Sequence, residues 1–184
     1  MTSTAAHSQP LSDTTTAAPP AWRPGPVARL TLAVARICLG WIFLWAFVDK
    51  MFGLGYGTPA SGAWIHGASP TAGYLGGVRG SFAHLFSSMS GQAWADWLYM
   101  VGMGGLGVAF VLGIGMRVAS IGGIALLGML WLSSLPLDTN PFMDQHLVYL
   151  VTAFALTACR AGDTLGLGKW WAGTGLVRAL PFLR

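Results

Sequence analysis

Five polar side chains occur near the ends of long apolar stretches, where few other polar residues are found. They are Lys50, Asp96, Asp144, His146 and Tyr149. If the apolar stretches cross a membrane, these side chains come to one level near the outer interface. A lipid-soluble ring with polar carbonyls, such as a quinone, places its head group at that level, and a histidine or carboxylate beside it can pass protons. We therefore predict a quinone site with His146, Lys50 and Asp144 as its catalytic residues.

Arg36 is notable because it lies inside an apolar stretch rather than at its end. It follows Arg29 by two helical turns, roughly 10 Å along a helix axis. A guanidinium at that depth either faces a protected interior or extends back to the lipid headgroups. Lys50 comes 14 residues after Arg36, about 40° short of four whole turns, so the two residues project from nearly the same helix face.

The predicted quinone-binding residues are the polar groups at the outer level together with Arg36 and Trp97. Plainer roles stay open for several of them. An acid such as Asp144 suits the first turn of a helix, lysines and tryptophans anchor helix ends at the interface, and His146 could bond a carbonyl or water. The predicted binding set is Arg36, Lys50, Asp96, Trp97, His146 and Tyr149.

Several other chemistries do not fit the sequence. No cysteines and histidines have the spacing of metal ligands, and a haem held between two helices would need two histidines in the apolar stretches, where only His146 occurs. We therefore expect neither a metal nor a haem. Cys38 and Cys159 fit small buried hydrophobic residues better than a disulfide framework.

Composition indicates what surrounds the chain. Of its 184 residues 54% are hydrophobic and only 9% are charged, and there is no glutamate. An average soluble domain has about 25% charged residues, whereas lipid does not require polar cover. The net charge of +4 does not indicate nucleic acid, because the basic residues lie at the ends of apolar stretches. Membrane lipid is therefore the first expected partner.

The apolar stretches predict an all-α integral membrane four-helix bundle. The first stretch has 22 residues, which as a helix reach about 33 Å, against a hydrocarbon core of about 30 Å. Asn140 and Pro141 suit the start of the last helix as its N-cap and first residue. The expected bundle covers residues 27–172, between a disordered tail at 1–26 and a C-terminal tail at 173–184. Its expected spans are 27–48, 97–116, 118–136 and 142–160.

The distribution of lysine and arginine predicts the orientation. With four spans, the basic residues before the first helix, at Arg117 and after the last helix all fall on one side. The opposite side has only Lys50 and Arg79. Because positive flanks stay in the cytoplasm, we expect both termini to be cytoplasmic and the protein to cross the plasma membrane several times.

Two further features concern contacts between elements. The long outer loop, 51–95, is rich in glycine and aromatic residues, and its segment 81–90 predicts a short helix lying on the membrane surface. Such a loop is either a functional lid or a passive cover. The stripe Gly105, Ala109 and Gly113 predicts close contact between helices, within the bundle or in a homo-oligomer.

The chain resembles the DoxX/DoxD family of small bacterial four-helix membrane proteins. The resemblance rests on the segment Ala-Arg-Ile-Cys-Leu-Gly-Trp-Ile-Phe-Leu at 35–44, on Lys50, and on Ala-Gly-Asp-Thr-Leu-Gly-Leu-Gly at 161–168. It covers about residues 28–172, and Arg36 and Lys50 match the family's pattern in the first helix. Phe47 stands where that pattern usually has a small residue.

The resemblance implies a membrane-linked redox role. DoxD-like members are the large subunit of thiosulfate:quinone oxidoreductase, which works with a small partner subunit. DoxX-like members are also associated with scaffolding of oxidoreductase complexes. We therefore expect either a quinone-linked redox subunit or a non-catalytic scaffold for a soluble oxidoreductase. A small-molecule transporter ranks third, because no repeat relates the first two helices to the last two.

Overall fold

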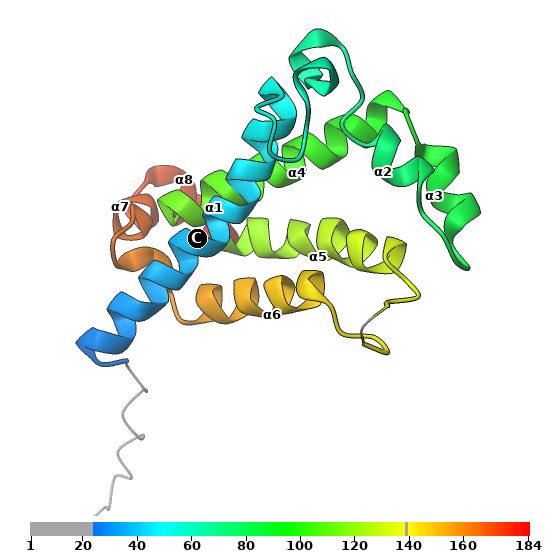
Figure 1. The fold of residues 1–184 in the computed structure, drawn as a ribbon. Helices are drawn as coiled ribbons and strands as arrows, with labels where there is room; N and C mark the ends of the chain where they lie inside the picture. Colours follow the sequence, from blue (N-terminus) through cyan, green and yellow to red (C-terminus); the bar gives the residue numbers. More distant parts are fainter. Residues whose placement is uncertain (1–23, 139) are drawn as a thin grey trace, which may run out of the picture.

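The computed structural model describes residues 24–138 and 140–184. Within these residues the fold is entirely helical, with no strand, as expected from the sequence. The predicted disordered tail, 1–26, lies almost wholly outside the described residues. Figure 1 shows the long helices α1, α4, α5 and α6 side by side, with shorter helices at both ends.

Three helices are long and apolar enough to cross a membrane: α1 (Pro26–Phe52), α4 (Ala93–Leu112) and α5 (Met116–Ser133). Helix α1 has 27 residues and reaches about 40 Å. It begins with Pro26, which suits a first turn because its missing N–H would lack an intrahelical partner. It ends at Gly53, whose φ of 64° is left-handed and unfavourable for other residues. These three helices indicate a membrane protein.

The fourth expected span is shorter than predicted. Helix α6 (Gln145–Ala158) has 14 residues, about 21 Å, and this length alone does not cross a bilayer core. The predicted helix start at Asn140 and Pro141 is wrong. Asp144 is the N-cap, because its side chain accepts hydrogen bonds from the backbone N–H groups of His146 and Leu147. The carboxamide oxygen of Asn140 instead accepts from the N–H groups of Phe142 and Met143, 3.1 and 2.9 Å away.

Helices α1 and α4 approach each other closely through two glycines. A Cβ on Gly107 would lie 2.6 Å from the backbone nitrogen of Leu44, and a Cβ on Gly40 would lie 2.6 Å from that of Val111. The predicted contact within the chain at Gly105 is wrong, since a Cβ there would meet nothing within 4 Å, whereas a Cβ on Gly113 of the same stripe would lie 2.8 Å from the Cα of Gly162. On α4 the contacting glycine is therefore Gly107, which lies on another face than Gly105.

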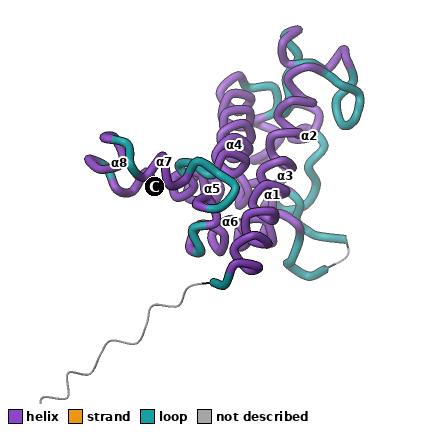
Figure 2. Tube along the Cα trace, turned by 90° about the vertical axis from the view of Figure 1, so that its left-hand side faces the viewer, coloured by secondary structure: helices purple, strands orange, loops and turns teal. Residues whose placement is uncertain are grey.

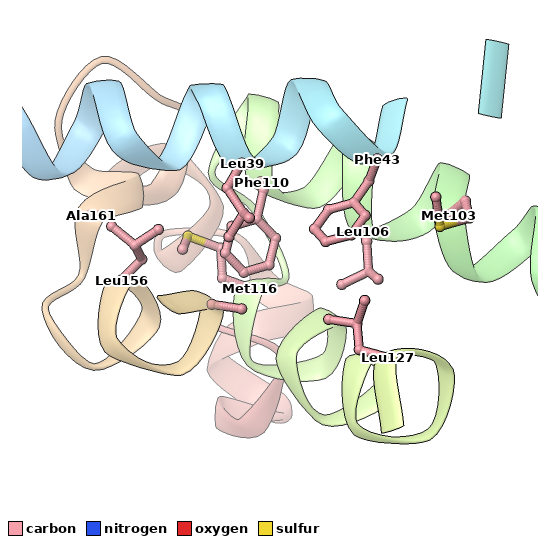
Figure 3. Packing of buried hydrophobic residues seen from close by; sticks show 10 residues of the cluster. Leu39, Phe43, Met103, Leu106, Phe110, Met116, Leu127, Leu156 and Ala161 are labelled. Atoms are coloured by element: carbon pink, nitrogen blue, oxygen red, sulfur yellow. The ribbon is translucent and has the colours of Figure 1, made fainter. Parts of the chain in front are cut away.

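Phe47 of α1 packs against a glycine of α4. A Cβ on Gly104 would lie 3.1 Å from the Phe47 ring, so the missing side chain on α4 makes room for the large one on α1. The hydrophobic core continues beneath this contact. In Figure 3, Leu39 and Phe43 of α1 point toward Leu106 and Phe110 of α4, which lie in one buried cluster with residues of α5 and α6.

The segment after α1 folds into η1 (Ala60–Gly62), η2 (Trp64–His66), α2 (Ala72–Gly76) and α3 (Ala83–Met89). The helix predicted within 81–90 is thus confirmed. Leu75 of α2 and Phe86 of α3 form a second buried cluster with Ala95 of α4. The loop therefore packs on the start of α4; we call this end of the helices the loop end.

The opposite end, where α1 and α5 begin and α4 and α6 end, we call the basic end. The chain continues there through η3 (Ala161–Asp163), α7 (Gly168–Ala172), α8 (Gly175–Ala179) and η4 (Pro181–Leu183). The expected C-terminal tail at 173–184 thus contains helical turns. The indole N–H of Trp171 donates to the carbonyl of Leu183 over 2.7 Å. Figure 2 shows α7 and α8 projecting from one side of the long helices.

Candidate functional site

A cavity of about 830 Å³ lies between α4 and α5. Helices α1, α2, α3 and α6 complete its walls. Most of the lining is apolar, and glycines on both principal helices leave room: Gly105 of α4 and Gly122 of α5 line the cavity, and a Cβ on either would meet nothing within 4 Å. The volume falls within the range of ligand pockets, about 300–1,000 Å³.

Polar side chains gather at the loop end of this cavity. Lys50, near the end of α1, lines it, and its ammonium nitrogen lies 5.8 Å from the ring centroid of Tyr99 on α4. In residues 24–138 and 140–184, no carboxylate oxygen lies within 4.0 Å of that nitrogen. The ammonium is thus held by a weak cation–π contact and can meet an electronegative group in the cavity.

His146 also lines the cavity and is oriented by Asp144. Its Nδ1 lies 2.5 Å from Oδ2 of Asp144, and the two side chains are 17% and 13% exposed. The other carboxylate oxygen accepts the backbone N–H groups of His146 and Leu147. Because the carboxylate binds Nδ1, the second ring nitrogen, Nε2, remains for a bound molecule.

Tyr149 lies one helical turn beyond His146 and lines the same cavity. Its ring packs edge-on against Phe43, with centroids 5.9 Å apart. Across the cavity the hydroxyl of Tyr74 hydrogen-bonds to Ser133, with the oxygens 2.9 Å apart. Of the predicted residues, the structure therefore brings together Lys50, His146 and Tyr149, with Asp144 directly behind the histidine.

Arg36 lies outside the cavity, toward the basic end. It is fully buried, and its guanidinium donates to the carbonyls of Phe110 and Val111 at the end of α4. It also donates to Leu165, 2.8 Å away, and to Thr164. The C-terminal carbonyls of a helix attract a cation, because they carry the negative end of the helix dipole. Arg36 thus joins α1, α4 and the segment after η3.

Asp96 and Trp97 also lie away from the cavity lining. Asp96 is 7% exposed and accepts hydrogen bonds from the hydroxyls of Ser69 and Thr71, over 2.7 and 2.6 Å. Trp97 is 61% exposed and packs edge-on against Trp64, with centroids 4.7 Å apart. Asp96 therefore ties the loop to α4, and Trp97 covers the outside of that joint.

Sequence reasoning missed two residues. Asp49 is 4% exposed and accepts the backbone N–H groups of Tyr56 and Gly57, at 3.2 and 2.9 Å; the Gly-rich turn following it was the available signal. Tyr99 follows Asp96 by three residues on α4, about one helical turn. That spacing from a polar residue was the available signal that its hydroxyl also faces the other helices. Neither was in the predicted set.

The described residues contain no group of three histidine, cysteine or carboxylate side chains that could hold a metal ion. Cys38 and Cys159 are unbonded thiols. A comparison of the chain with protein-family models finds no match, and comparisons with curated proteins and with solved structures find no significant match either.

Proposed function

We propose that this protein is the membrane subunit of a quinone-linked redox system and binds a quinone in the cavity between α4 and α5. The observation that carries the proposal is that this cavity has a polar end and an apolar remainder. Lys50, His146 and Tyr149 lie at its loop end, whereas the walls toward the middle of α4 and α5 are apolar. A molecule with a polar ring and a long apolar tail fits this division.

The exposed side of the cavity supports a position for the apolar tail. Val101 of α4 and Val118 of α5 both line the cavity and are 63% and 44% exposed. In a membrane these residues meet lipid, so the cavity opens to the bilayer between the two helices. We propose that the tail lies along this opening and that the ring reaches the loop end.

The polar residues then have distinct roles. The ammonium of Lys50 stabilises negative charge on a ring oxygen, which is the largest kind of contribution a fixed group makes to such chemistry. His146 donates or accepts a proton at Nε2, and Asp144 positions its ring from behind. Reduction of a quinone to a quinol takes up two electrons and two protons. The chain's residues supply the binding site and the proton transfer, and a partner protein supplies the electrons.

We assign oxidation of an electron donor such as thiosulfate to that partner, a small subunit or a soluble oxidoreductase. A dianion is bound by several cations. On the proposed outer side, the described residues offer Lys50 and Arg79, and neither free thiol is among the residues that line the cavity.

We further propose that α6 crosses the membrane beside α5, which gives a four-span bundle. The hydroxyl of Ser120, early in α5, bonds that of Thr157, late in α6, with the oxygens 2.8 Å apart. The indole N–H of Trp131, late in α5, donates to Phe142, just before α6. The two helices are thus aligned at both ends, so the short helix and its flanks cover the same depth as α5.

Binding of a short-tailed ubiquinone or menaquinone to the purified protein in lipid nanodiscs tests the function. Gly122→Leu fills the cavity, and we expect it to weaken binding at least tenfold, which corresponds to about 1.4 kcal/mol. Gly128→Leu is the matched control, because a Cβ at Gly128 also meets nothing within 4 Å but does not line the cavity. His146→Ala and Lys50→Met test the polar end in the same assay.

Equal quinone affinity in the wild type and Gly122→Leu would overturn the proposed site. Absence of quinone binding, together with co-purification of a soluble oxidoreductase in mild detergent, would support the scaffold role instead.

A further inference from the structure

We propose that the basic end holds a binding site for the phosphate of an anionic phospholipid. The site is a small recess of about 30 Å³ lined by three arginines, Arg117, Arg160 and Arg184. It lies at the opposite end of the helices from the proposed quinone cavity and does not depend on it.

The recess has an excess of positive charge. Asp163 is the one carboxylate in its lining, and it pairs with Arg184 over 3.3 Å. Its lining side chains are three guanidinium groups and one carboxylate, so their summed charge is positive. A phosphodiester supplies the opposite charge, and its oxygens match the planar fork of arginine donors.

The three arginines are held to different degrees. Arg117 donates to the carbonyl of Pro181 over 3.1 Å. Arg160 has a left-handed backbone, with φ of 52°, which non-glycine residues rarely adopt. Among residues 24–138 and 140–184, its guanidinium makes no hydrogen bond or ion pair. Arg160 therefore lines the recess with all its donors open to an anion.

The neighbouring C-terminal arm, α7 to η4, favours a lipid over a water-soluble phosphate. Trp170, Leu176 and Phe182 are 64%, 53% and 59% exposed, and Lys169 and Arg178 are exposed on the same arm. Exposed apolar side chains next to cations are typical of segments that lie in the headgroup region, with the apolar groups reaching the acyl boundary. On the proposed cytoplasmic side, anionic lipids attract such basic segments.

The recess and the arm meet at Trp171, which lines the recess and belongs to α7. A phospholipid with its phosphate at the arginines can therefore place its acyl chains beside the exposed residues of the arm. A soluble anion would use the arginines and leave the apolar arm without a partner.

Lipid binding to the full-length purified protein tests the site. Delipidated protein in neutral detergent is incubated with phosphatidylglycerol or phosphatidylcholine, and bound lipid is measured by native mass spectrometry. We expect phosphatidylglycerol to bind at least fivefold more tightly than phosphatidylcholine. Arg160→Asn is expected to remove most of this preference; asparagine is chosen because it tolerates the left-handed backbone.

Arg29→Gln is the matched control, because it removes one positive charge from the same end without touching the recess. Trp170→Ser is expected to weaken phosphatidylglycerol binding and to leave binding of inorganic phosphate unchanged. The proposal is overturned if phosphatidylcholine binds equally well, if Arg29→Gln lowers the preference as much as Arg160→Asn, or if inorganic phosphate alone competes fully with the lipid at equal concentration.

Discussion

Two residues predicted to act at one site have separate structural settings. His146 lines the cavity with Asp144 behind it, whereas Arg36 is fully buried near the basic end and bonds four carbonyls. The histidine has a ring nitrogen left for a ligand, but the guanidinium is occupied by the protein itself. At the scale of single residues, we therefore expect changes next to His146 to affect quinone reduction and changes at Arg36 to affect stability.

Asp144→Asn separates positioning of the histidine from helix capping. Asparagine remains a good N-cap, so we expect thermal stability in detergent to change little. The negative charge behind Nδ1 is lost, and since a charge-assisted bond is about twice as strong as a neutral one, we expect roughly tenfold slower quinone reduction, or about 1.4 kcal/mol. Asp144→Ala, which also removes the cap, should lose about 1 kcal/mol of stability as well.

Arg36→Met tests a structural role against a ligand-binding role. Hydrogen bonds to a charged group contribute about 1.5–3 kcal/mol each, so we expect a loss of at least about 3 kcal/mol in unfolding free energy, measured by thermal unfolding in detergent. Quinone affinity, measured below the unfolding temperature, should stay close to that of the wild type. If Arg36→Met has normal stability but no longer binds quinone, Arg36 has a ligand-binding role instead.

At the scale of elements, glycines have two different uses on one helix. Gly107 allows α1 and α4 to touch, whereas Gly105 opens the cavity on another face. Spacing alone predicted contact at Gly105, because a small-residue stripe has the same pattern whether it faces a helix or a void. The partner that distinguishes the two is Leu44 on another helix, and sequence spacing does not supply it.

Gly107→Val is expected to force α1 and α4 apart. Its Cβ would lie 2.6–2.7 Å from Leu44 backbone atoms, and overpacking of a tight contact typically costs about 1–3 kcal/mol. We expect a lower unfolding temperature in detergent, by several degrees. Gly105→Ala, whose Cβ meets open space, should unfold at or slightly above the temperature of the wild type, because alanine favours a helix more than glycine does. A similar loss in both variants would contradict the contact of α1 and α4 as its cause.

The outer loop shows how much of an element can be read from sequence. The helix within 81–90 was predicted because Phe82, Leu85, Phe86 and Met89 have helical spacing, and α3 confirms it. The start of α6 is the part of the fold that the sequence predicted wrongly. Asn140 and Pro141 favour a helix start, so the sequence placed the beginning of α6 too early. In the structure Asp144 supplies the cap, and Asn140 closes a turn instead.

For the whole molecule, composition was sufficient for the all-helical fold and for three helices long enough to cross a membrane. Long apolar stretches give few alternatives in lipid, because every backbone polar group must be paired within the segment. The site was predictable only as a level in the membrane. Lys50, His146 and Tyr149 line one cavity, but which other side chains face it depends on how α4 and α5 pack.

Orientation is the prediction that belongs to the whole chain. If α6 crosses beside α5, the chain has four spans, and residue 184 and the start of α1 lie on the same side, which the distribution of lysine and arginine predicts to be cytoplasmic. A tag after residue 184 should then resist labelling by a membrane-impermeant reagent in intact cells and react after permeabilisation. A tag after Arg79, on the loop, should react in both; labelling of the C-terminal tag in intact cells would leave three spans.

The bonds of Arg36 link the beginning of the chain to its end. Its acceptors lie 74 and 75 residues later on α4, and 128 and 129 residues later at Thr164 and Leu165. During synthesis, α1 emerges first and carries a guanidinium whose partners have not yet been translated. An unpaired charge within lipid is unfavourable, so a nascent chain that stops before residue 164 leaves that charge partly uncompensated. The first helix therefore gains its full set of stabilising bonds only when the last segment has been translated.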